Sequence, residues 1–176
     1  MSGGLPTSID PVWLANQQTR LSGTIPLKRM KRLLADCHSE EGDARVDLQF
    51  GSDPNSEQRT MRGSIEAAVV ITCERCLEPM TLPLVADIDM LIVTAEQAAA
   101  VDEQEDLLVA DGPISLGELA ENELILAMPM IPMHPEDECP ASTLLRDQGI
   151  AEKNRQDDGE TESPFAKLAE LKRTDR

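Results

Sequence analysis

Apolar and polar residues alternate over two long stretches of the chain that flank residues 73–78. The apolar positions keep a period of two on both sides: Met61, Ile65, Ala67, Val69 and Ile71 before, and Met80, Leu82, Leu84, Ala86, Ile88 and Met90 after. Two strands of this kind around a short turn predict an antiparallel hairpin. A shorter alternation over 43–50, followed by a turn cluster, adds another strand. We therefore expect an antiparallel sheet formed by 43–50, 60–72 and 79–93.

The sequence also predicts helices before and after these strands. Asp10 and Pro11 predict a short helix over 9–18, with Asp at the N-cap and Pro at the first helical position. Ser115 and Glu118 form a capping box for a second helix, which Pro129 ends because proline lacks an amide donor. A short strand is expected at 107–110. The predicted fold class is α+β, an antiparallel β-sheet with short flanking helices.

A further helix is predicted from Pro26 over 26–34. At helical spacing its residues fall on two sides. The apolar side holds Leu27, Met30, Leu33 and Leu34, and the basic side holds Lys28, Arg29, Lys31 and Arg32. Four cations on one side could meet several phosphates. The alternative is a solvated surface, or one that pairs with the acidic 102–138 segment of the same chain.

The composition predicts three parts. Residues 1–139 hold the apolar patterns and form an α+β core domain, and 140–163 have the polar composition of a flexible linker. Residues 164–176 form a short C-terminal helix or tail, with Phe165, Leu168 and Leu171 on one face. That face either docks on the core domain or enters the groove of a partner.

The net charge of -17 at pH 7 indicates which kinds of partner the chain can bind. Residues 102–138 contain eleven Asp or Glu and no Lys or Arg, which favours cationic partners through electrostatic steering. The simpler interpretation is a solvated acidic face. The longest uncharged apolar run, 124–133, is short and interrupted by Pro129 and Pro132, so no membrane span is expected. Since the first twenty residues contain no continuous apolar stretch, we expect a cytoplasmic protein with reduced cysteines.

Cysteine and histidine form the most specific chemical pattern. Cys73 and Cys76 lie at the predicted hairpin turn, and His134 and Cys139 follow about sixty residues later. Two residues between the thiols let both sulfurs face one tetrahedral metal, so the four residues predict a structural zinc site. Reduced, unligated thiols are the alternative. Cys37 has no such partner and is interpreted as a small buried side chain.

The chain lacks the motifs of common enzymes. It contains no glycine-rich phosphate loop, nucleophile elbow or HExxH motif, and its only histidines are His38 and His134. A zinc ion with four protein ligands would also leave no open position for water. We therefore expect no enzymatic activity, no small-molecule substrate and no required cofactor, with structural zinc as the one metal that the chain could hold.

Aromatic side chains, on which single-stranded RNA readers stack bases, are scarce. Only Trp13, Phe50 and Phe165 are present. RNA contact through the basic 28–32 helix and Arg75 would therefore be electrostatic and would not read sequence.

Several blocks in a fixed order resemble a known family. They are Ile9-Asp10-Pro11, residues 72–79 (TCERCLEP), 121–132 (ENELILAMPMIP), 134–139 (HPEDEC) and 163–173 (SPFAKLAELKR). With these blocks, which run nearly end to end, the chain resembles the YceD family of large ribosomal RNA subunit accumulation proteins. The resemblance implies a small cytosolic protein needed for synthesis, processing or stability of 23S ribosomal RNA, and it brings no catalytic residues.

The expected function is that of a non-enzymatic ribosome-biogenesis factor that acts on 23S rRNA, its precursor or basic large-subunit ribosomal proteins. The acidic charge favours the proteins. The alternative is a direct RNA-binding module with structural zinc that uses Lys28, Arg29, Lys31, Arg32 and Arg75.

Overall fold

The computed structural model describes residues 5–52, 58–98 and 106–142. The chain divides into two compact units, 1–133 and 134–176. In the second unit only residues 134–142 are described, and these contain a turn followed by a short helical segment. The predicted linker at 140–163 lies almost wholly outside the described residues, and the predicted C-terminal helix lies entirely outside them.

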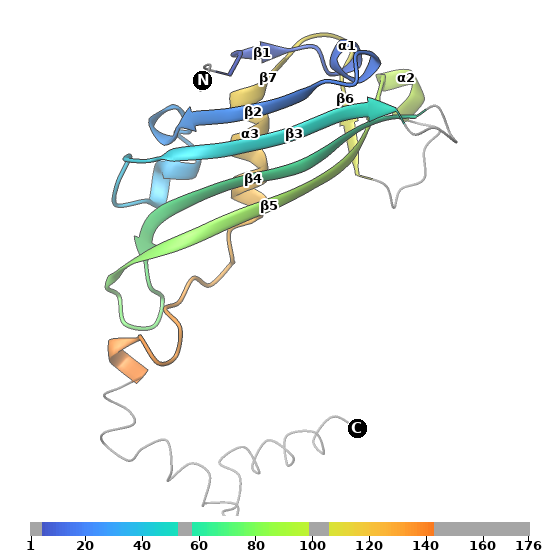
Figure 1. Cartoon of the computed structure of the whole chain (residues 1–176). Coiled ribbons are helices and arrows are strands. Elements are labelled where there is room, and N and C mark those ends of the chain that lie inside the picture. Colours follow the sequence, from blue (N-terminus) through green and yellow to red (C-terminus); the bar gives the residue numbers. More distant parts are fainter. Residues whose placement is uncertain (1–4, 53–57, 99–105, 143–176) are drawn as a thin grey trace, which may run out of the picture. The chain divides into compact units, whose positions relative to one another are not determined.

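A five-stranded sheet forms the centre of the first unit (Figure 1). Its order is β2-β3-β4-β5-β6, with bounds Arg20–Pro26, Asp43–Ser52, Arg59–Thr72, Pro79–Val93 and Leu107–Val109. The first four strands pair antiparallel in sequence order, and β6 pairs parallel with β5. Short strands β1 (Ser8–Ile9) and β7 (Ile114–Ser115) form a separate antiparallel pair. The fold is α+β, as predicted.

The β4–β5 hairpin is the longest pairing and obeys the period of two read from the sequence. Its register runs from Arg59 opposite Ile92 to Thr72 opposite Pro79. The apolar positions of both strands share one face, and Met61, Ile65, Val69 and Leu84 on it are buried. Polar residues such as Arg62 and Asp89 occupy the other, exposed face. The sheet therefore has one core face and one solvent face.

Helix α3 (Leu116–Leu126) covers the core face of the sheet (Figure 1). The Ser115 hydroxyl accepts from the Glu118 amide at 3.2 Å and caps the helix, as the sequence predicts. The helix buries Leu116, Leu119, Ala120 and Leu124. Helix α1 (Pro11–Asn16) begins at the predicted Asp10 cap and packs near β3 and β4.

The prediction of one continuous helix over 26–34 is wrong. Two 3₁₀ turns occupy the segment instead, η1 (Leu27–Arg29) and η2 (Leu33–Asp36). Met30 leaves the helical region with φ -100° and ψ 71°, so the two turns do not join. Leu27, Met30 and Leu33 are still buried, because the apolar spacing suits either helix type. Helix α2 (Ala95–Ala98), which lies between β5 and β6, is a single turn.

Among the described residues, none of the helices has the length and apolar character that crossing a membrane requires.

Candidate metal centre and the surface beside it

The β4–β5 turn positions Cys73 and Cys76. The Cys73 amide donates to the Glu78 carbonyl at 2.9 Å, and the Leu77 amide donates to the Cys73 carbonyl at 2.9 Å. Leu77 has a positive φ of 62°, which turns the chain sharply directly after Cys76. These bonds close a tight loop in which only two residues separate the thiols.

A second turn carries Cys139. The Cys139 and Glu138 amides both donate to the Pro135 carbonyl, at 3.0 and 3.1 Å. The Ser142 amide then donates to the Cys139 carbonyl at 3.0 Å. His134 directly precedes this turn, so one short segment supplies both an imidazole and a thiol.

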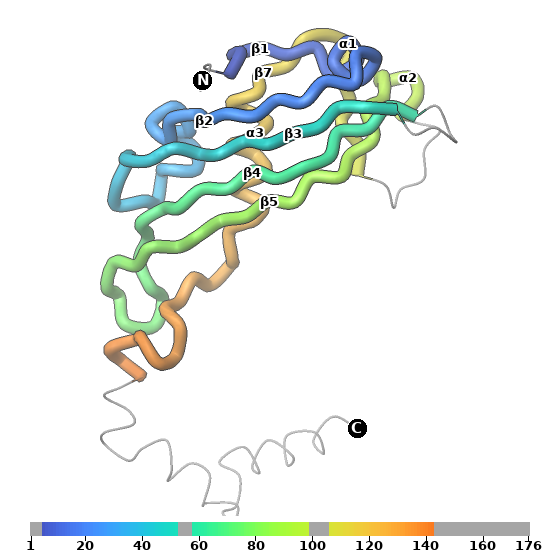
Figure 2. The backbone as a smooth tube through the Cα atoms, in the orientation of Figure 1, coloured from blue at the N-terminus to red at the C-terminus, as the bar shows by residue number. Residues whose placement is uncertain are grey.

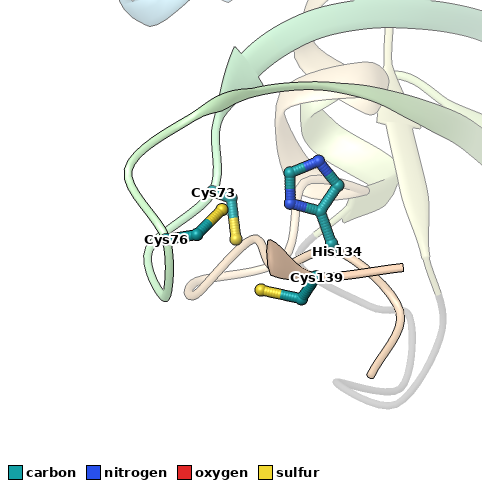
Figure 3. Close-up of side chains that lie close together, drawn as sticks. All are labelled: Cys73, Cys76, His134 and Cys139. Carbon is teal, nitrogen blue, oxygen red and sulfur yellow. The ribbon is translucent and has the colours of Figure 1, made fainter. Parts of the chain in front are cut away.

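The structure brings together the four residues that the sequence singles out. The ligand atoms of Cys73, Cys76, His134 and Cys139 all lie within 4.8 Å of one another. Figure 3 shows the three sulfurs and the imidazole ring around a common space. Cys73 and Cys139 are fully buried, and the other two are half-buried. The cluster therefore lies partly in the protein interior and partly at its surface.

The donor set fits zinc. Thiolates bind Zn²⁺ at about 2.3 Å and imidazole nitrogen at about 2.0 Å, so tetrahedral ligand atoms lie roughly 3.5 to 3.8 Å apart. An upper limit of 4.8 Å on every pair of ligand atoms leaves only small side-chain movements to reach that geometry. The cluster can therefore bind a metal ion, with four protein ligands and no position left for substrate.

Glu121 binds the basic segment to α3. Its carboxylate accepts from the Arg32 amide at 2.7 Å, the Leu33 amide at 3.3 Å and the Arg32 guanidinium at 2.9 Å. Burial by itself would raise the pKa of Glu121, but the Arg32 side-chain bond, the two amide bonds and the Arg32 charge outweigh it and lower the pKa below its ordinary value. Arg32 is thus engaged in an ion pair within the fold.

The other predicted basic residues differ in position. Lys28, Arg29 and Lys31 are exposed on and beside η1. Arg75 is half-buried and its guanidinium lies 3.5 Å from the Met133 sulfur. Phe165, Leu168 and Leu171 lie outside the described residues, so their predicted partner contact stays a prediction.

Cys37 stands apart from the metal cluster. It is half-buried, and its thiol donates to the Leu33 carbonyl at 3.3 Å. Burial, and after it the charge of Asp36, raise the pKa of this thiol. The Cys37 thiol is therefore less acidic than an ordinary cysteine and is bonded within its own turn.

A groove beside the hairpin turn was not predicted from the sequence. It has a volume of about 490 Å³ and lies between the end of β4 and the loop that follows α3. The Glu74 amide donates to the Pro132 carbonyl at 2.8 Å and joins this loop to the turn. The uncharged, proline-interrupted run at 124–133 was the available signal, but it only excluded a membrane span.

Comparisons with known proteins agree over most of the chain. A family model described as "Large ribosomal RNA subunit accumulation protein YceD" matches residues 61–172, a range that includes the hairpin, α3 and all four ligand residues. A curated protein of Haemophilus influenzae with the same description is 30% identical, and the alignment covers 96% of both chains. No solved structure matches the chain.

Proposed function

This chain belongs to the YceD family of large ribosomal RNA subunit accumulation proteins, and from that membership we propose that it supports 23S rRNA accumulation without catalysing a reaction. The family match is the observation that carries the proposal. The cytoplasm is the proposed location, because large subunits assemble there in bacteria.

The proposed mode of action is to hold basic large-subunit ribosomal proteins during assembly. The net charge of -17 opposes contact with RNA phosphates over a broad surface and favours Lys- and Arg-rich proteins. Burial, and after it the nearby charge of Asp106, raise the pKa of Glu123 on α3.

The absence of catalysis is part of the proposal. Among the described residues, the buried polar side chains are Thr60 and Glu121, and Glu121 is fully engaged by Arg32 and Leu33. The metal cluster offers four protein ligands, the number typical of structural zinc. These features support a binding protein.

Structural zinc is the proposed occupant of the cluster. It would fix the hairpin turn against the segment that contains His134 and Cys139. Cobalt is the test probe, because Co²⁺ bound to three thiolates gives strong visible absorption. We expect one equivalent of Co²⁺ to bind, zinc to displace it, and Cys76→Ser to abolish the signal while Cys37→Ser preserves it. No spectral change on adding cobalt to the reduced chain would contradict the zinc proposal.

Direct RNA binding is the second candidate, supported by the exposure of Lys28, Arg29 and Lys31. Its test is charge reversal of these three residues, with binding to 23S precursor fragments measured at two salt concentrations. If this mode operates, reversal weakens binding and flattens its salt dependence. Unchanged affinity in the variant rules the mode out.

The preferred mode is tested by crosslinking the full chain in growing cells and identifying what it captures. We expect basic large-subunit proteins to be recovered directly, with recovery that survives nuclease treatment before purification. Recovery of 23S RNA with no directly attached ribosomal protein would contradict the protein-holding mode.

A further inference from the structure

The loop that follows α3, residues 127–133, lies beside the β4–β5 turn (Figure 2). Two contacts hold them together, from the Glu74 amide to the Pro132 carbonyl at 2.8 Å and from the Arg75 guanidinium to the Met133 sulfur at 3.5 Å. Pro129 and Pro132 restrict the backbone of this loop. The loop is therefore anchored and stiff even though it contains no regular secondary structure.

Large apolar side chains of the loop and the turn are exposed. Met130 is fully exposed, Leu77 is 74% exposed and Ile131 is 63% exposed, and Met133 is exposed as well. We call Leu77, Met130, Ile131 and Met133 the turn-loop patch. Single exposed apolar residues are ordinary, but a group on neighbouring anchored segments marks an interaction site.

Leu77 gives an independent indication. Its φ of 62° lies in the left-handed region, where glycine or asparagine costs less than leucine. Its side chain is mostly in solvent, so burial in the core does not offset that cost. A leucine here is unfavourable for the isolated chain and useful only if something covers it.

The groove beside the patch indicates the charge of its partner. Met128, Met130 and Pro132 supply apolar lining, while Asp36 and Glu74 supply exposed carboxylates. No basic side chain occurs among the described residues that line the groove, and the guanidinium of Arg75 lies outside this lining, against Met133 of the patch. An apolar floor with acidic walls complements an apolar side chain flanked by lysine or arginine.

We propose that the turn-loop patch and its groove bind an extended segment of a basic protein, with an apolar side chain against Met128 and Met130 and flanking cations near Asp36 and Glu74. Methionine side chains adapt to different apolar partners, and the proline-stiffened loop lowers the ordering cost of binding. This inference rests on the proposed protein-holding function and assigns it a surface.

The test uses labelled synthetic peptides that tile the large-subunit ribosomal proteins, titrated with the full chain and followed by fluorescence anisotropy. We expect binding by peptides in which lysine or arginine flanks an apolar residue. Met130→Ser combined with Ile131→Ser should weaken binding about tenfold or more, the loss typical of truncating a central interface residue. The matched control is Val85→Ser, which alters an exposed apolar residue on the sheet and should leave binding unchanged.

Two further variants separate binding from stability. Leu77→Gly should keep the thermal stability of the chain, since it relieves the positive φ, yet weaken peptide binding. Asp36→Asn combined with Glu74→Gln should weaken binding and reduce its salt dependence. Equal weakening by the Val85 control would overturn the inference.

Other outcomes also overturn it. In the first, substitution of Met130 weakens the binding of RNA fragments but not the binding of the peptides. In the second, the chain associates with itself and the Met130 variant does not. If intact ribosomal proteins bind equally well to the patch variants, the surface is wrong while the proposed function stands. If the unaltered chain binds no ribosomal protein, both fail.

Discussion

Gly63 permits the close pairing of β3 with β4. It lies in the middle of β4 opposite Leu48 and Ile88, and its φ is 148°. A Cβ atom at this position would overlap the Asp47 carbonyl oxygen of β3. Only glycine lets the two strands approach this closely.

Gly63→Ala should therefore destabilise the chain. We expect a loss of about 1 to 3 kcal/mol in the free energy of unfolding, measured by urea denaturation, because the strand must shift or adopt a strained φ. Gly51→Ala is the matched control, since a Cβ at Gly51 in β3 would meet no atom within 4 Å. Equal stability of the two variants would contradict this account of β4.

Glu121→Gln tests the ion pair with Arg32, in which the carboxylate is buried and the guanidinium is exposed. The substitution removes the charge that four nitrogen donors of Arg32 and Leu33 share, which should cost about 1.5 to 3 kcal/mol of unfolding free energy near neutral pH. Asp89→Asn, which alters the exposed pair with Arg62, should change stability little.

The same residue predicts a pH dependence. Because the folded chain lowers the pKa of Glu121, its stabilisation is complete above the ordinary value of 4.5 and is lost as the pH falls through the lower folded value. The stability difference between the unaltered chain and Glu121→Gln should thus shrink below pH 4.5. A difference that stays constant there would show that the charge of Glu121 is not what stabilises η2.

At the scale of elements, zinc binding at the β4–β5 turn should raise the stability of the chain. Zinc at about a hundredfold excess over its dissociation constant adds roughly 2.7 kcal/mol, which corresponds to a rise of about 5 to 10 °C in melting temperature for a chain of this size. Cys73→Ser should remove the rise, while Cys37→Ser should retain it. A rise of the same size in both variants would place the metal elsewhere.

Strands and capped helices were readable from the sequence because local rules determine them. The β4–β5 hairpin follows a strict period of two, and Asp10 and Ser115 cap their helices as predicted. Strand β2 was not predicted, since Ser22, Gly23 and Thr24 interrupt its apolar pattern and its pairing with β3 supplies its stability. The basic segment was predicted as one helix because apolar spacing does not distinguish a helix from two short 3₁₀ turns.

The candidate site was readable only in part. The spacing of Cys73, Cys76, His134 and Cys139 indicated a shared metal, and the fold brings their ligand atoms together. The exposure of Met130 and the left-handed Leu77 depend on how the turn meets the loop after α3, and no local pattern encodes that. Arg32 was a candidate for RNA contact, with pairing to the acidic 102–138 segment as the alternative, and the structure shows that pairing through Glu121.

At the scale of the whole molecule, the net charge of -17 should govern association. Complexes with basic ribosomal proteins should weaken steeply as salt rises, because screening shortens electrostatic attraction to about 10 Å at 0.1 M ionic strength. Combining Met130→Ser with Ile131→Ser should lower affinity at every salt concentration without changing how steeply affinity falls as salt rises. Association rates from stopped-flow fluorescence would measure the steering directly, and rates independent of salt would contradict it.

We propose that this chain promotes accumulation of large-subunit RNA by holding basic proteins. The most direct measurement is competition on the purified full chain, with labelled large-subunit proteins and naked 23S rRNA at equal salt. We expect stable complexes with one or more of the proteins and no RNA complex of comparable affinity. Tight binding to 23S rRNA, with no ribosomal protein bound, would contradict it.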